Sequence, residues 1–217
     1  MLNTDFSQRI VIHSHDMEWV GSPAEGVMRK PLAREQQERG QATSIVRYEK
    51  GAKFNRHLHP LGEEILVLEG IFSDEAGDYP AGSYIRNPPG SGHTPFSVEG
   101  CTLLVKLHQF AENDTEQFVI DTKSSVWLPG IGGLQVMPLH SFGQENIALV
   151  KWPANQVFPK HQHIGGEEVL VLSGTFKDEF GEYPVGTWTR SPHLSEHSPY
   201  TDQETVIWVK RGHLLMA

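Results

Sequence analysis

The sequence has 217 residues, with 18 Lys and Arg against 27 Asp and Glu, so its formal net charge at pH 7 is −9. This acidic balance argues against nucleic acid as a partner, because phosphate binding depends on clustered basic side chains. With 21 Gly and 14 Pro, the composition favours many short elements joined by turns and predicts an all-β or β-rich chain.

Short β-branched and aliphatic runs, separated by clusters of Gly, Pro, Asn and Asp, recur along the chain and are typical of β-strands. In chain order they cover residues 44–50, 64–70, 101–107, 148–152, 168–174 and 205–210. Residues 32–40 predict either one helical segment or a surface excursion. The sequences YPAG and YPVG, at residues 79–82 and 183–186, predict turns. Six or more strands in each half point to a closed barrel or a sandwich in each half.

The chain contains two copies of one pattern, and this repeat sets its expected organisation. Residues 56–95 align without an insertion with residues 160–199, at an offset of 104. The same offset carries Val46 onto Val150 and Lys106 onto Lys210. We therefore predict two tandem all-β domains of one fold, at residues 1–111 and 116–217. The polar stretch AENDTE, at residues 111–116, is the expected junction.

Each copy holds three histidines and one glutamate at the same spacing. The two sets are His57, His59, Glu63 and His93, and His161, His163, Glu167 and His197. Side chains two apart on a strand share a face, so His57 and His59 should point together. Glu63 keeps this parity if extension continues through residues 60–62, although the Pro and Gly there can bend the strand. A later strand or loop must bring in the last histidine of each set.

Buried His and Glu side chains are costly unless they are paired or bound to a metal, and a metal would explain their convergence. Three neutral imidazoles and one carboxylate suit a divalent transition metal rather than Ca²⁺ or Mg²⁺. We expect two metal sites per chain, with zinc or iron foremost and manganese or nickel as further candidates. The alternative is that the histidines only pack or lie on the surface.

Four apolar residues share the parity of the two glutamates and could form a dry wall beside each metal. They are Ile65 and Val67 in the first copy, and Val169 and Val171 in the second. Such a wall favours a small organic ligand. His193, four residues before His197, could line the second pocket or lie on its rim.

The residues at these sites carry a family resemblance. The motifs are Gly51-x5-His57-x-His59-x3-Glu63-x6-Gly70 and Gly82-x5-Pro88-x-Gly90-x2-His93. They resemble the two signature motifs of the cupin superfamily, with Ser97 where the family pattern has Asn and Asn155 where the second copy should have Gly. Within that superfamily the chain resembles the cupin domain of the anti-sigma factor ChrR family. This resemblance implies jelly-roll barrels, a bicupin, and zinc or another divalent metal at the matching positions.

Three function classes remain open, and one of them, a purely structural metal site, needs neither a substrate pocket nor a partner surface. The resemblance favours a metal-binding module with a regulatory or ligand-sensing role, although the sequence shows no counterpart of the Cys/His zinc domain that grips the sigma factor in that family. The alternative is a metal-dependent dioxygenase acting on a small diketone, hydroxyketone or aromatic compound, because such enzymes share this cupin subtype. Either a small molecule or a protein could be the partner.

The cysteine content and the N-terminal sequence indicate the cellular compartment. Cys101 is the single cysteine and cannot form an intrachain disulfide. The first 16 residues lack the basic start and the apolar run of a signal peptide. No segment has the roughly 18 consecutive apolar residues of a transmembrane helix. We therefore expect a cytoplasmic protein without a membrane partner.

Overall fold

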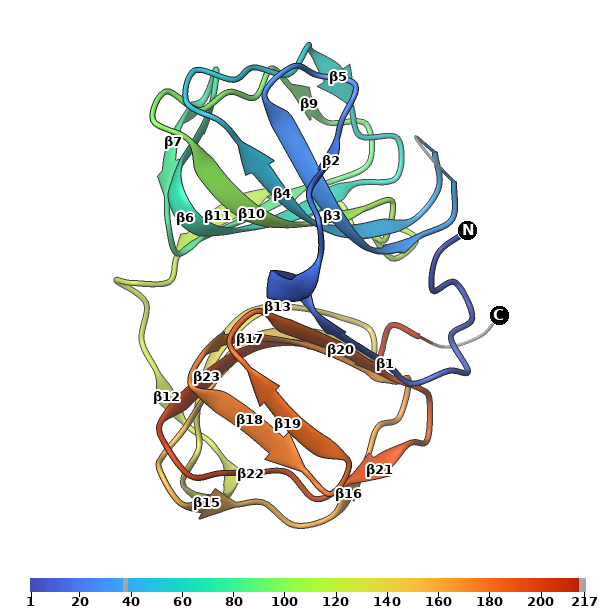
Figure 1. Ribbon diagram of the computed structural model, residues 1–217, viewed down its shortest axis with the longest axis vertical. Helices are drawn as coiled ribbons and strands as arrows, with labels where there is room; N and C mark the ends of the chain where they lie inside the picture. The colour runs from blue at the N-terminus through green and yellow to red at the C-terminus, as the bar shows by residue number, and fades with distance from the viewer. Residues whose placement is uncertain (37–38, 215–217) are drawn as a thin grey trace. The chain divides into compact units, whose positions relative to one another are not determined.

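The computed structural model describes residues 1–36 and 39–214, and nearly all of its regular structure is β-strand (Figure 1). The helices in these described ranges are two short 3-10 turns, η1 (Ser14–Asp16) and η2 (Ile131–Gly133). None of the described helices is long and apolar enough to cross a membrane. The predicted all-β class is therefore confirmed, and each predicted strand coincides with an observed one.

The chain divides into two compact units, each described here by itself. The first unit comprises residues 1–4 and 17–125, and the second comprises residues 5–16 and 126–217. The main sheet of the first unit has the order β11-β8-β6-β10-β4-β3-β2, with β7 paired to β6, and a separate ladder joins β5 to β9. The bounds are β2 (Val20–Gly21), β3 (Val27–Arg34), β4 (Ala42–Tyr48), β5 (His57–Leu58), β6 (Glu63–Asp74), β7 (Gly77–Pro80), β8 (Ser83–Asn87), β9 (Gly92–His93), β10 (Cys101–Leu107) and β11 (Phe118–Asp121).

The second unit repeats this arrangement. Its main sheet has the order β1-β20-β17-β23-β14-β13-β12, a smaller sheet has the order β15-β22-β18-β19, and β16 pairs with β21. The bounds are β1 (Ile10–His13), β12 (Leu128–Pro129), β13 (Gln135–Phe142), β14 (Glu145–Trp152), β15 (Gln156–Val157), β16 (His161–Gln162), β17 (Glu167–Ser173), β18 (Thr175–Asp178), β19 (Gly181–Pro184), β20 (Thr187–Ser191), β21 (Glu196–His197), β22 (Tyr200–Thr201) and β23 (Thr205–Arg211).

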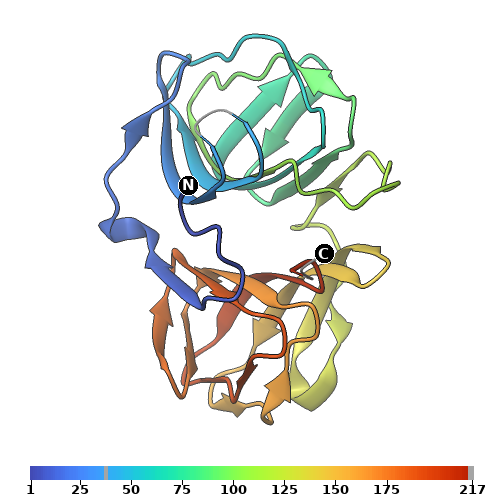
Figure 2. The ribbon, with the colours of Figure 1, turned by 90° about the vertical axis from the view of Figure 1, so that its right-hand side faces the viewer.

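The two sequence copies exchange their first strands. β1, from the start of the chain, pairs with β20 of the second unit (Figure 2). The register places Ile10 opposite Arg190. β11, from the start of the second copy, pairs with β8 of the first unit, with Phe118 opposite Arg86. Each exchanged strand covers what would otherwise be an open sheet edge. The domain limits predicted from the repeat, 1–111 and 116–217, describe the sequence copies and stay a prediction.

Two local expectations are resolved within the described residues. Residues 32–34 end β3, and the Glu35 amide then donates to the Gln41 carbonyl at 3.0 Å, so the helix alternative for residues 32–40 is wrong there; residues 37 and 38 lie outside the described part. The segments predicted as turns begin in strands, because Tyr79 and Pro80 belong to β7. The chain turns at residues 81–82, where Gly82 has a φ of 96° that favours glycine.

Buried apolar residues of the inward strand faces form one core in each unit. In the first unit Ile65, Val67 and Leu103 are each 1% exposed, and in the second unit Val169 and Val171 are 2% and 1% exposed. Asp114, in the expected junction, is also buried, and its Oδ2 lies 2.5 Å from Nη2 of the fully buried Arg86. This ion pair fixes the chain beside the first unit just before the exchanged strand β11.

Candidate metal centres

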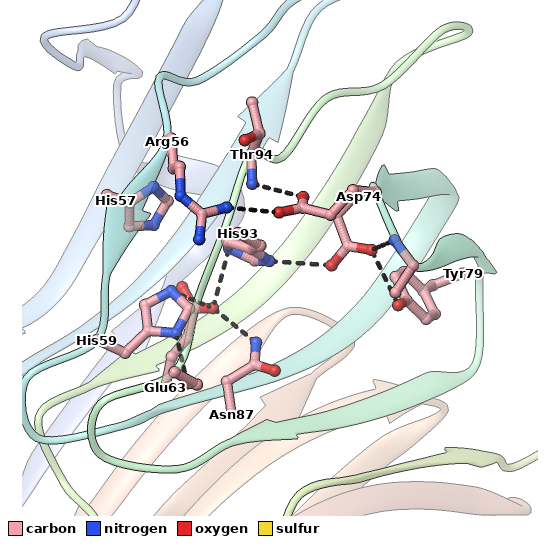
Figure 3. Close-up of polar contacts among 12 residues, drawn as sticks. Arg56, His57, His59, Glu63, Asp74, Tyr79, Asn87, His93 and Thr94 are labelled. Atoms are coloured by element: carbon pink, nitrogen blue, oxygen red, sulfur yellow. Dashed lines mark hydrogen bonds and ion pairs between the residues drawn. The ribbon is translucent and has the colours of Figure 1, made fainter.

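The first His/Glu set converges where three short segments of the first unit meet (Figure 3). β5 and β9 place His57 directly opposite His93, His59 follows β5, and Glu63 begins β6. One ligand atom of each of the four residues lies within 4.8 Å of the other three. Of the two possibilities for residues 60–62, a continuous strand or a bend, the structure has the bend, since β5 ends at Leu58. A turn before β6 brings Glu63 to the histidines instead.

The outer nitrogen of each imidazole in this cluster faces an acceptor. His57 Nδ1 lies 3.0 Å from the Asn55 carbonyl oxygen, His59 Nδ1 lies 3.0 Å from Ser91 Oγ, and His93 Nδ1 lies 3.1 Å from Asp74 Oδ2. A carbonyl and a carboxylate only accept, and the Ser91 hydroxyl donates its own proton to the Pro88 carbonyl at 2.6 Å. All three histidines therefore carry their proton on Nδ1 when neutral.

This tautomer leaves an unprotonated Nε2 on each imidazole, and those of His59 and His93 face the Glu63 carboxylate. Glu63 Oε2 lies 3.3 Å from His59 Nε2 and 3.5 Å from His93 Nε2. Within residues 1–36 and 39–214, His59 Nε2 is buried and has no hydrogen-bond partner. Burial lowers the pKa of His59, which disfavours the protonated form of this imidazole. These four electron-rich atoms fit a shared cation, with outer hydrogen bonds of the kind that orient metal ligands.

A fifth side chain holds the carboxylate in place. Asn87 Nδ2 donates to Glu63 Oε2 at 3.1 Å, and both residues are buried. The amide fixes one oxygen of Glu63 without adding a charge. The Glu63 carboxylate thus lies between the Asn87 amide and the imidazoles of His59 and His93 (Figure 3).

The second unit repeats the histidine arrangement almost atom for atom. β16 and β21 place His161 opposite His197, and ligand atoms of His161, His163 and His197 lie within 4.8 Å of one another. Their Nδ1 atoms face the Pro159 carbonyl oxygen at 3.1 Å, Ser195 Oγ at 3.0 Å and Asp178 Oδ2 at 3.1 Å. Nε2 of His163 and Nε2 of His161 are 3.3 Å apart. Burial, with His197 and His161 nearby, lowers the pKa of His163 to about 3, so these two lone pairs also face each other.

Glu167 stands apart from its three predicted partners. Its Oε1 lies 3.5 Å from His163 Nε2, yet it does not reach all three imidazoles within the 4.8 Å that joins them. The position of Asn87 is taken by Ser191, and no side-chain hydrogen bond joins Ser191 to Glu167 in the described part of the chain, although the two residues are register partners of β20 and β17. Burial raises the pKa of Glu167. The second site is therefore a three-histidine cluster with a nearby, less constrained carboxylate.

The first cluster opens into a cavity of about 550 Å³. His57, His59, Glu63 and His93 line it, and the predicted pocket residue Ile65 lies in its wall. Val67, Val169 and Val171 are packed in the hydrophobic cores. The remaining predicted pocket residue, His193, is exposed, and its Nδ1 accepts the Gly165 amide at 2.8 Å.

Sequence reasoning missed the residues that orient the ligands. Asp74 and Asp178, and likewise Ser91 and Ser195, are identical pairs at the same offset of 104 as the histidines. That identity was a usable signal for a shared role. Asn87 carries no such signal, because the second copy has a different residue there.

A duplicated all-β unit that brings His-x-His, a glutamate and a later histidine to one point defines the cupin class, here as a bicupin. The model of the ChrR cupin-like domain family matches residues 7–111 and again residues 115–215. The chain belongs to the ChrR cupin-like domain family.

Comparison with known proteins agrees with this fold. The chain is 37% identical over 62 residues to the anti-sigma-E factor ChrR of Cereibacter sphaeroides, which covers 28% of this chain and 29% of that protein's length. A proposed dioxygenase from Nostoc punctiforme matches with a TM-score of 0.81 at 15% identity, covering 97% of this chain and 85% of that one. The Bacillus subtilis oxalate decarboxylase, described with Mn(II) centres, matches with a TM-score of 0.65 at 15% identity, covering 95% and 78%. At these identities the structural likeness shows the fold alone.

Proposed function

We propose that this protein binds one divalent transition metal in each unit. The main support is the protonation pattern of His57, His59 and His93. Their Nδ1 atoms all face acceptors, so their Nε2 atoms carry lone pairs rather than protons. Nitrogen ligands with one carboxylate suit zinc or iron, then manganese or nickel. The proposed ligands are His57, His59, Glu63 and His93, and His161, His163 and His197 with Glu167 beside them.

We further propose that the first site senses a small molecule. Its four ligand residues line a cavity whose size lies in the range of small-molecule pockets. A bound ligand would meet the metal site directly, which is the arrangement that a ligand-sensing, regulatory cupin needs. A sigma factor or other protein partner has less support, since the similarity to the anti-sigma factor covers 62 residues.

The same cavity supports a second candidate, a dioxygenase. Iron held at the first site would supply oxygen activation when bound. Buried apolar side chains such as Ile65 and Leu103 would exclude water from an organic substrate beside it, for which a diketone, a hydroxyketone and an aromatic compound remain candidates. Asn87 and Asp74 would keep Glu63 and His93 oriented during turnover.

The predicted cytoplasmic location stays a prediction.

Elemental analysis of the purified protein, with and without reconstitution, tests the metal proposal. The wild-type chain should carry two equivalents of a transition metal, and His59→Ala and His163→Ala should each carry about one. Thermal unfolding monitors the fold of each variant. A wild-type protein that binds no transition metal after reconstitution would contradict the proposal. Oxygen uptake by the iron-loaded protein with the three substrate classes decides between sensor and enzyme.

A further inference from the structure

The described lining of the cavity in the first unit contains more basic than acidic side chains. Its charged lining among the described residues comprises Arg29, Arg34 and Arg39 against the single carboxylate of Glu63. The rest of the wall is largely apolar and includes Val46, Leu103 and Val105. This pairing of a cationic part with an apolar part matches an organic anion.

The strand register fixes where two of these arginines stand. Across the sheet, Glu63 pairs with Leu107, Leu107 with Ala42, and Ala42 with Arg34. Arg34 is thus level with the Glu63 end of the sheet. Arg29 pairs with Val46, deeper along the same strand. Both side chains line one cavity with the metal-site residues.

Two further polar groups lie in this wall. Ser44 is 4% exposed, lines the cavity, and within the described residues its Oγ has no hydrogen-bond partner. A buried hydroxyl without a partner is costly, and a polar ligand group would satisfy it. Tyr48 also lines the cavity. Arg29 lines the same cavity.

The second unit replaces each of these polar residues. In the matching strand register, Arg29 corresponds to Val136 opposite Val150, and Arg34 to Ser141 opposite Asn146. Ser44 corresponds to Ala148 at the offset of 104. The histidine clusters are common to both units, whereas the basic wall belongs to the first.

We propose that the cavity of the first unit binds a small organic carboxylate, with its anionic group held by Arg29 and Arg34 and its apolar body against Leu103 and Val105. Ser44 Oγ donates a hydrogen bond to the same ligand. The inference deepens the proposed ligand-sensing role and rests on it. It also assigns the ligand to one unit of the two.

Isothermal titration of the metal-loaded full chain tests this with 4-phenylbutanoate and its neutral isostere 4-phenylbutanamide. The carboxylate should bind once per chain, about tenfold or more tightly than the amide, because hydrogen bonds to charged groups are the stronger ones. Arg29→Val and Arg34→Ser, which install the residues of the second unit, should each weaken carboxylate binding about tenfold and leave amide binding unchanged. Ser44→Ala, the smallest change, should weaken it about two- to tenfold. Arg47→Gln, at an exposed arginine of the same sheet, is the charge-matched control and should have no effect.

Four results would each overturn the inference. They are equal binding of both probes, binding of two carboxylates per chain, no binding of the carboxylate, and normal carboxylate binding by folded arginine variants. Ser44→Ala keeps the test decisive if an arginine variant fails to fold. Metal content, measured on the same samples, separates the two proposals. A chain that binds metal but does not prefer the carboxylate to the amide would refute the carboxylate-binding cavity. A chain that binds the carboxylate through its arginines but holds no metal would refute the metal sites.

Discussion

Asn87 and Ser191 occupy the same position in the two copies, and exchanging them should weaken the first metal site and strengthen the second. Asn87 Nδ2 donates to Glu63 Oε2 at 3.1 Å, whereas Glu167 has no such partner at Ser191 in the described chain. Asn87→Ser should therefore release Glu63 from its cluster. Ser191→Asn should draw Glu167 toward His163.

The expected size follows from the lost contact. A hydrogen bond to a charged group contributes about 1.5–3 kcal/mol, which corresponds to about 10- to 150-fold in affinity. Loss of an outer partner of a metal ligand commonly weakens binding about 10- to 100-fold. We expect Asn87→Ser to weaken the first site within that range, and Ser191→Asn to strengthen the second by a smaller factor, because Ser191 is buried and the larger amide must be accommodated.

Competition with a chromogenic chelator measures both effects. Each site is titrated alone, the first in a His163→Ala background and the second in a His59→Ala background, and thermal unfolding of the metal-free proteins reports on packing. Unchanged affinity of the first site in a folded Asn87→Ser variant would refute the view that the amide positions the carboxylate. An unchanged second site in Ser191→Asn would refute the explanation for the position of Glu167.

Three further predictions concern the surrounding structure. Asp74→Asn and Asp178→Asn should each weaken only the metal site of their own unit, by about 10- to 100-fold in the same chelator titration, and loss of the other site would contradict two independent centres. Asp114→Asn removes the closest carboxylate of the fully buried Arg86 but leaves Glu64 at 3.4 Å, so it should lower the free energy of unfolding by less than the roughly 3–5 kcal/mol of a fully uncompensated buried charge. Glu112→Gln, at an exposed position, should not lower it, and a matching denaturation midpoint for both variants would contradict the anchoring role. Burial raises the pKa of Cys101 to about 11 from 9.0, so the thiol loses its proton in the unfolded chain at a lower pH than in the native protein. The native state should therefore lose about 2 kcal/mol of stability between pH 9 and pH 11. Denaturation curves of Cys101→Ala should lack this part of the decline, and a pH profile identical to that of the wild type would contradict the prediction.

The sequence repeat was sufficient to predict strands and convergent histidines, because both follow from local patterns present twice. β-Branched runs correspond to observed strands, and the two histidine trios meet at the spacing that the repeat preserves. The sequence left the route of Glu63 open between a continuous strand and a bend, and a turn brings it to the cluster.

The exchange of first strands could not be predicted in this way. Pairing of β1 with β20 joins Ile10 to Arg190, across almost the whole chain. A short strand fits either of two homologous edges equally well by its pattern, so the choice depends on the path of the connecting segments. The same upstream region, where the repeat weakens, contains Arg29 and Arg34. Their place in the cavity follows from strand register, which sequence alone leaves open.

Anomalous diffraction from crystals of the metal-loaded protein, recorded at the absorption edge of the bound metal, tests the central claim most directly. The account predicts one peak in each unit, with Nε2 of His57, His59 and His93, and of His161, His163 and His197, about 2.0–2.2 Å from it, and with Nδ1 of each ring still facing its acceptor. Glu63 should complete the first site. Crystals of metal-loaded protein that show no peak among these nitrogens, or rings turned so that Nδ1 faces the centre, would contradict the account.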